Sequence, residues 1–203
     1  MSTPGGFIDG VFTADGASGP VAVTSTGLKV TLPRTTRGLF DYIKAEPNVT
    51  CLSTMNGVDF AAVGHTMIAL HANAGITFDL RSLAPAQPAQ AMRFTAVMGL
   101  ANARGTATAR VYLDGRLVAE RYFDRVAAGV ALELPLTRAD RFLTLVATDG
   151  DLTGPVADIG SDQVVFGDPQ IHLSFPVKPG ESIRPILDDA GAARGKTLDG
   201  ESP

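Results

Sequence analysis

The sequence has no tryptophan, one cysteine and few aromatic side chains, with 10 Phe and 3 Tyr among 203 residues. The single cysteine, Cys51, excludes an intrachain disulfide bond. It is either a small buried hydrophobe or a reactive thiol, and the sequence leaves both open. Without tryptophan, a binding site in this chain is expected to use planar polar side chains together with one Tyr or Phe ring.

Positive charge is scarce as well. The chain has 17 Lys and Arg against 21 Asp and Glu, a net charge of −4, and no cluster of basic residues. Nucleic-acid binding needs a basic face that neutralises phosphates, so no nucleic-acid partner is expected. No apolar run reaches the length of a membrane span, and the N-terminal MSTPGGF lacks the basic and apolar regions of a signal peptide. We expect a soluble chain, either whole or cut from a longer exported protein.

Catalytic signatures are missing too. The sequence has no GxSxG elbow, HExxH pair, phosphate loop, dinucleotide fingerprint or CxxC motif. Two carboxylates could still act as acid and base in glycoside hydrolysis. Nothing in the sequence indicates the apolar pocket that would raise the pKa of one of them. We therefore expect a protein that is not an enzyme, with a small hydrolase as the remaining catalytic alternative.

What the chain does have is alternation of apolar and polar residues. Residues 142–148 have the two-residue period of a long apolar strand, and we expect neighbouring elements to cover both of its faces. Residues 106–122 alternate around Asp114-Gly115, which predicts a hairpin with a tight turn. Residues 130–136 alternate likewise, and Pro135 predicts an edge position for this strand.

Two further strand pairs are expected. Residues 21–23 and 28–32 flank Ser25-Thr26-Gly27 and predict a hairpin. Residues 67–70 and 76–80 are predicted to pair across a turn at residues 73–75. With nine or ten short strands and no amphipathic helix of three turns, the chain is predicted to be an all-β antiparallel sandwich, with a jelly roll as one plausible connectivity.

Three parts are expected within this one main domain. Residues 1–56 are predicted to form N-terminal strands that pack on or extend the sandwich. Residues 57–176 are predicted to form the sandwich core. Residues 177–203 turn polar and small, as is typical of a flexible tail or linker.

An acidic stretch follows the strand at residues 142–148. Its carboxylates are Asp149, Asp151, Asp158, Asp162 and Asp168. Oxygen-rich clusters of this kind suit Ca²⁺, which takes six to eight oxygen ligands, although the other ligands of an EF-hand loop are absent. The stretch either holds a ligand or a cation, or is a solvated connection rich in turn residues.

The three histidines are spread along the chain. His65 and His71 are six residues apart, which would place both on one face of an unbroken strand. They either bind a metal as a pair or are separately hydrogen-bonded. His172 alternates with Ile171 and Leu173, so we expect it on the opposite face from the core, in a structural or surface role.

Two stretches together resemble the NPCBM family of carbohydrate-binding modules, whose members are galactose-binding-like β-sandwiches that are often attached to glycoside hydrolases and other exported bacterial proteins. The first stretch is GHTMIALHANAGITFDL, residues 64–80. The second combines ARVYLDGRLVAE, residues 109–120, with LTLVATDGD, residues 143–151. Before them, LFDYIKAEPN and STMNGVDF look like the lead-in of planctomycete-like versions of this domain.

The resemblance implies a set of site residues. His71 and Asn73 match the family's histidine and small polar residue, and Asp149 and Asp151 match its acidic loop. Tyr112, inside the second stretch, is the expected ring of the ligand site.

A calcium ion, if bound, is expected on the acidic side chains. These are Asp149, Asp151, Asp162 and Asp168. The chain departs from the family pattern where Val165 replaces an acid and Phe166 replaces a tryptophan.

The leading hypothesis is a non-catalytic module that binds carbohydrate and targets or accessorises an exported enzyme or surface protein. Its expected partners are a carbohydrate and other domains of a larger protein, and its expected location is extracellular, cell-surface or periplasmic. The alternative is a structural or protein-interaction sandwich module in an extracellular assembly.

Overall fold

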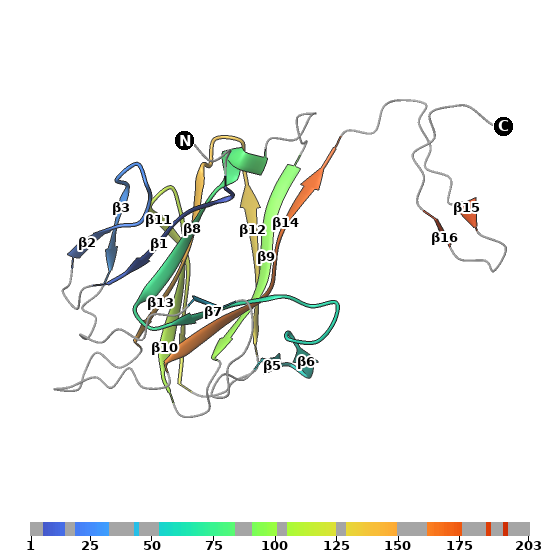
Figure 1. The fold of residues 1–203 in the computed structure, drawn as a ribbon, viewed down its shortest axis with the longest axis horizontal. Helices are drawn as coiled ribbons and strands as arrows, with labels where there is room; N and C mark the ends of the chain where they lie inside the picture. The colour runs from blue at the N-terminus through green and yellow to red at the C-terminus, as the bar shows by residue number, and fades with distance from the viewer. Residues whose placement is uncertain are drawn as a thin grey trace.

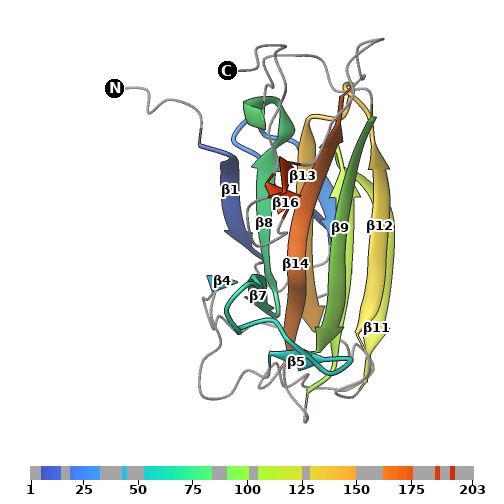
Figure 2. The ribbon, with the colours of Figure 1, turned by 90° about the vertical axis from the view of Figure 1, so that its right-hand side faces the viewer.

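Two antiparallel sheets of five strands each face one another (Figures 1 and 2). The structure is a computed structural model. It describes residues 6–14, 19–32, 43–44, 53–83, 91–100, 105–124, 129–149, 162–175, 186–187 and 193–194. The predicted all-β antiparallel sandwich is confirmed.

The first sheet has the order β1-β8-β13-β10-β11. Its strands are β1 (Ile8–Thr13), β8 (Ala74–Asp79), β13 (Phe142–Asp149), β10 (Ala107–Leu113) and β11 (Arg116–Phe123). The second sheet has the order β12-β9-β14-β7-β4. Its strands are β12 (Val130–Leu136), β9 (Ala91–Leu100), β14 (Gln163–Ser174), β7 (Met67–His71) and β4 (Ile43–Lys44).

Three small hairpins and one helical turn complete the described elements. They are β2 (Gly19–Ala22) with β3 (Lys29–Leu32), β5 (Thr54–Met55) with β6 (Val58–Asp59), β15 (Ile186–Leu187) with β16 (Ala193–Arg194), and the 3-10 helix η1 (Leu80–Leu83). No helix within the described ranges is long and apolar enough to cross a membrane.

The strands are connected as in a jelly roll. From β7 to β14 the chain crosses to the opposite sheet at every connection except the β10–β11 hairpin. Successive strands of a jelly roll belong to alternate sheets in this way. The prediction that residues 67–70 pair with residues 76–80 is therefore wrong. These residues lie in β7 and β8 of different sheets, and Ala72 and Asn73 carry the chain across the end of the sandwich.

Alternation along each strand fills the space between the sheets. Leu143, Leu145 and Ala147 of β13 face the core, and their partners on β10 do the same. The other face of β13 is buried as well, because the β2–β3 hairpin packs Val23 and Val30 against Val146 and Tyr112. The predicted strand with both faces covered is confirmed, since every residue of β13 is buried.

The β5–β6 hairpin covers part of the outer face of the second sheet. Met55 and Phe60 pack there against Met67, Ala69 and Val165. Gly167 lies against the ring of Phe60, and a Cβ atom at Gly167 would approach the Phe60 ring to 2.5 Å. A glycine is needed at this position because real Cβ atoms do not come so close to another carbon.

The turn and edge predictions are also confirmed. Asp114 and Gly115 have φ angles of 48° and 77°, which is the left-handed region that a tight hairpin turn requires. The Asp114 carboxylate accepts a hydrogen bond of 2.9 Å from the Phe142 N–H and so ties this turn to β13. Pro135 lies on β12, an edge strand of the second sheet.

A β-bulge divides β14 into two halves. The pairing register with β9 shifts between Gly167 and Gln170, and Asp168 has a φ of 44°. Phe166 before the bulge and Ile171 after it both pack in the core, although five positions separate them. The extra residue therefore exchanges the two faces of the strand, and His172 points away from the core, as the sequence predicted.

Candidate functional site

Five polar side chains are buried together at one end of the sandwich. This end cluster consists of His71, Asn73, Asp149, Asp162 and Gln163, whose exposed fractions are 1–4%. They come from the end of β7, the β7–β8 connection, the end of β13 and the start of β14. Four of these five residues were predicted site residues, so the fold brings most of the predicted set together.

Hydrogen bonds made by residues of the end cluster join the two sheets. The Asp162 carboxylate accepts a bond of 2.8 Å from the N–H of Thr106, which precedes β10 of the first sheet. The Asp162 carbonyl accepts a bond of 2.7 Å from the N–H of Ala72, which follows β7 of the second sheet. Asn73 Oδ1 accepts a bond of 3.2 Å from the Asp149 N–H. Asp162 and Asn73 thus fix the backbone at this end of the molecule.

The imidazole of His71 is held by its neighbour. Its Nδ1 atom lies 2.8 Å from the Ala72 carbonyl oxygen, to which it donates a hydrogen bond. Burial lowers the pKa of His71 below its usual value of 6.5, against the opposing effect of the bond to Ala72. The ring is therefore neutral at pH 7. Of the two interpretations of His65 and His71, the structure favours separate hydrogen bonding, because His71 ends β7 whereas His65 precedes β7 by two residues and bonds to Asp168.

Asp168 is not part of the end cluster. It lies in the bulge of β14, six residues beyond Asp162 and roughly 20 Å away at about 3.3 Å per strand residue. His65 Nδ1 lies 2.7 Å from its Oδ2 atom, and the Thr66 N–H donates a bond of 2.8 Å to its Oδ1 atom. Burial acts to raise the pKa of Asp168, but the bonds from His65 and Thr66 outweigh it and hold the pKa below its usual value of 3.8.

Tyr112 is also separated from the end cluster. It lies on β10, five residues from Ala107, the partner of Asp149. Its side chain is buried under the β2–β3 hairpin, on the face of the first sheet that points away from the core. Burial there raises the pKa of its hydroxyl group. Asp151, Asp158 and Cys51 lie outside the described residues.

Thr106 and Gln163 are members of this arrangement that the sequence did not reveal. Gln163 pairs with His71 in the β14–β7 register. Only strand pairing between distant segments creates these neighbours, so no local pattern could have found them. Within the described part of the chain, no group of three or more His, Cys, Asp or Glu side chains could hold a metal ion.

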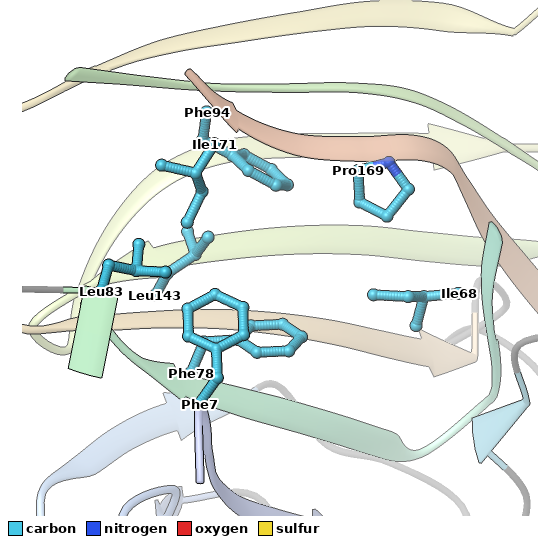
Figure 3. A pocket seen from close by; sticks show the side chains of 8 residues that line it. All are labelled: Phe7, Ile68, Phe78, Leu83, Phe94, Leu143, Pro169 and Ile171. Atoms are coloured by element: carbon cyan, nitrogen blue, oxygen red, sulfur yellow. The ribbon is translucent and has the colours of Figure 1, made fainter. Parts of the chain in front are cut away.

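A cavity of about 240 Å³ opens between the second half of β14 and β8 (Figure 3). Its walls are hydrocarbon side chains: Phe7, Ile68, Phe78, Leu83, Phe94, Leu143, Pro169 and Ile171. The rings of Phe7 and Phe78 lie 4.9 Å apart at its floor. Such walls offer no partner for hydroxyl groups, which are costly to bury without hydrogen bonds. This cavity does not suit a polar ligand.

Comparison with known proteins identifies the class of fold. No protein-family model matches the sequence, and no curated protein matches it. Among solved structures, the chain is similar to the CBM51 module of a Clostridium perfringens GH95 protein in complex with methyl-galactose. The identity is 22%, the match covers 68% of this chain and 91% of that one, and the TM-score is 0.51.

Two further matches are weaker. The CBM51-2 and INT domains of Clostridium perfringens ZmpB, in complex with GlcNAc, are 15% identical over 82% of this chain and 40% of that one, with a TM-score of 0.49. The tandem CBM51 modules of a family 98 glycoside hydrolase from Streptococcus pneumoniae are 13% identical over 70% and 44%, also with a TM-score of 0.49. The structural neighbours are thus CBM51 carbohydrate-binding modules, and the likeness is one of fold.

Proposed function

We propose that this protein is a non-catalytic carbohydrate-binding module. The observation that carries the proposal is the end cluster, whose buried imidazole, amide and carboxylate groups come from three strands and a connection at one end of the sandwich. Such groups donate to and accept from sugar hydroxyls, and each hydroxyl can both donate and accept. The fold that presents the cluster is similar to that of a module bound to methyl-galactose.

The proposed ligand site lies over the end cluster. His71, Asn73 and Asp149 are 1–3% exposed. They would lie beneath the ligand and hold in place the backbone that contacts the sugar. Asp151 follows Asp149 by two residues and is proposed as a direct ligand contact. Tyr112 is dropped from the site because its ring lies beneath the β2–β3 hairpin.

A calcium ion bound by Asp149, Asp151 and Asp162 is a second part of the proposal. The described residues supply two of these carboxylates, whereas Ca²⁺ takes six to eight oxygen ligands. Asp168 is dropped because its carboxylate is bound to His65 and Thr66.

We further propose membership of the NPCBM family in its planctomycete-like version and a role in an exported bacterial protein. We also propose the division of the chain into residues 1–56, 57–176 and 177–203.

The test is binding to a broad glycan array with calcium present, repeated after chelation. Asp149→Asn and Asn73→Ala are expected to weaken binding about tenfold, because each removes a partner from the end cluster. Asp124→Asn, on an exposed residue, is the matched control and is expected to bind normally. A blank array with the folded wild type would overturn the proposal. Loss of binding only in variants that no longer melt cooperatively would overturn the site assignment.

A structural or protein-interaction module is the second candidate. It is favoured by apolar side chains on the outermost strands of the first sheet. Ile8 and Val11 of β1 are 55% and 63% exposed, and Leu117 and Tyr122 of β11 are 45% and 49% exposed. Edge strands of this kind can pair with another chain. A stable oligomer in light scattering, together with a blank glycan array, would favour this candidate.

A further inference from the structure

The outer face of the second sheet is covered over only part of its length. The β5–β6 hairpin packs against Met67, Ala69 and Val165, all on the His71 side of the bulge in β14. Beyond the bulge, polar side chains on this face are exposed or half-buried. We call them the sheet-face patch: Arg93, Thr95, Glu133, Gln170 and His172.

Strand register places these side chains in two adjacent rows. Gln170 pairs with Thr95, and Thr95 pairs with Glu133. In the next row, His172 pairs with Arg93. Paired residues in a sheet point to the same face, and neighbouring strands lie about 4.8 Å apart. The five side chains therefore form one continuous surface across β14, β9 and β12.

Hydrogen bonds hold parts of the sheet-face patch in place. His172 Nε2 lies 2.8 Å from Thr95 Oγ1. Arg93 Nη1 lies 3.3 Å from Glu133 Oε1, and the two side chains remain 53% and 65% exposed. Both charged groups can thus meet a ligand while keeping each other oriented.

A hollow of about 430 Å³ adjoins the patch. It is lined by Ala91, Met92, Arg93, His172, Leu173 and Ser174. The small side chains of Ala91 and Ser174, which pair with each other, leave room beside Arg93 and His172. Small-molecule sites commonly have volumes of about 300 to 1,000 Å³, so the hollow is large enough for a sugar unit.

The chemistry of the patch indicates an uncharged ligand rich in hydroxyl groups. Arg93 only donates hydrogen bonds and an ionised Glu133 only accepts them. Two adjacent sugar hydroxyls can hydrogen-bond to both groups, since one accepts from the guanidinium while the other donates to the carboxylate. An anionic group that approaches Arg93 also meets Glu133, and a cation that approaches Glu133 also meets Arg93, so the pair offers no net charge to an ionic ligand.

We propose that the sheet-face patch is a second binding surface for carbohydrate, specific for neutral sugars. This inference rests on the proposed function but concerns a different surface. His172 lies nine residues along β14 from Gln163 of the end cluster, roughly 30 Å at about 3.3 Å per residue. The two surfaces can therefore be disabled separately.

The experiment compares Arg93→Ala and His172→Gln with wild type on an array of neutral, uronate-containing and sulfated glycans. Arg121→Ala is the matched control, because Arg121 is exposed on β11 of the first sheet. Wild type is expected to bind neutral glycans, with about tenfold weaker binding in the two patch variants and none of this loss in the control. Thermal melting checks that all variants are folded.

Three outcomes would overturn the inference. If both patch variants bind like wild type while Asp149→Asn loses binding, the end cluster alone binds sugar and the proposed function stands. If wild type binds only sulfated or uronate-containing glycans, the assignment of a neutral sugar fails. If wild type binds nothing on the array, the inference and the proposed function fail together.

Discussion

His65 and Asp168 clamp the bulge of β14, with 2.7 Å between the imidazole Nδ1 atom and the carboxylate. The Thr66 N–H donates to the same carboxylate, and the Asp168 N–H donates to the Thr66 carbonyl over 2.8 Å. Without the extra residue, strict alternation from Phe166 would turn Gln170 and His172 into the core. The clamp thus decides which side chains of β14 reach the surface.

Asp168→Asn is expected to lower the free energy of unfolding by about 1 kcal/mol at pH 7, because the charge-assisted bond to His65 is lost. Asparagine tolerates the left-handed backbone of this residue, so the variant tests the charge rather than the conformation. Urea unfolding of both proteins measures the difference.

The pH dependence of this difference follows from the lowered pKa of Asp168. A carboxylate whose folded pKa is depressed contributes stability above its unfolded pKa, and this contribution is lost as pH falls through the folded pKa. The advantage of wild type over Asp168→Asn should therefore shrink below about pH 4. An advantage of equal size at pH 7 and pH 3 would contradict the assignment.

Gly167→Ala is expected to loosen the β5–β6 hairpin, since the new methyl group would meet the Phe60 ring at 2.5 Å. Overpacking of this kind costs about 1 to 3 kcal/mol, which denaturant unfolding can measure. Gly10→Ala is the matched control in another strand, because a Cβ at Gly10 meets nothing within 4 Å. Equal stability of the two variants would show that Phe60 moves aside freely.

Thr77→Val is expected to weaken the attachment of the β2–β3 hairpin to the first sheet. The buried Thr77 hydroxyl donates a bond of 2.6 Å to the Val23 carbonyl and lies 2.9 Å from the Thr144 hydroxyl. Leaving these groups unsatisfied costs about 1 to 3 kcal/mol. Thr31→Val, on an exposed residue of β3, should change stability little. Thermal melting of both variants distinguishes the two positions.

Asp162→Ala is expected to free the end of the sandwich, because the Thr106 N–H loses its acceptor. Hydrogen exchange at Thr106 should become faster, and the free energy of unfolding should fall by about 1.5 to 3 kcal/mol. Asp140→Ala removes a similar bond of 2.7 Å from the Thr137 N–H at an exposed turn and serves as the control. Unchanged exchange at Thr106 would show that Asp162 does not hold the two sheets together.

The fold class was accessible from sequence because alternation is a local property. The hairpin at Asp114-Gly115 and the edge position of Pro135 follow from backbone preferences of single residues. The connection at Ala72 and Asn73 was predicted wrongly as a hairpin turn because the prediction used the local pattern alone. Its residues suit a hairpin and a crossing between sheets equally, and only packing over long distances chooses between them.

The candidate site was predictable in part. His71, Asn73, Asp149 and Asp162 do lie together, because the ends of their strands meet at one end of the sandwich. Asp168 and Tyr112 lie elsewhere, since position along a strand separates residues by about 3.3 Å each. The sheet-face patch depends on pairing among β14, β9 and β12, which no local pattern reveals.

The sequence by itself determined that this chain forms strands, where several of them turn, and that its two-residue period builds a sandwich. The tertiary structure decided which strands pair and which face of β14 reaches the surface beyond Asp168. The physical reason is that strand propensity acts within a few residues, whereas register and face depend on contacts between distant segments.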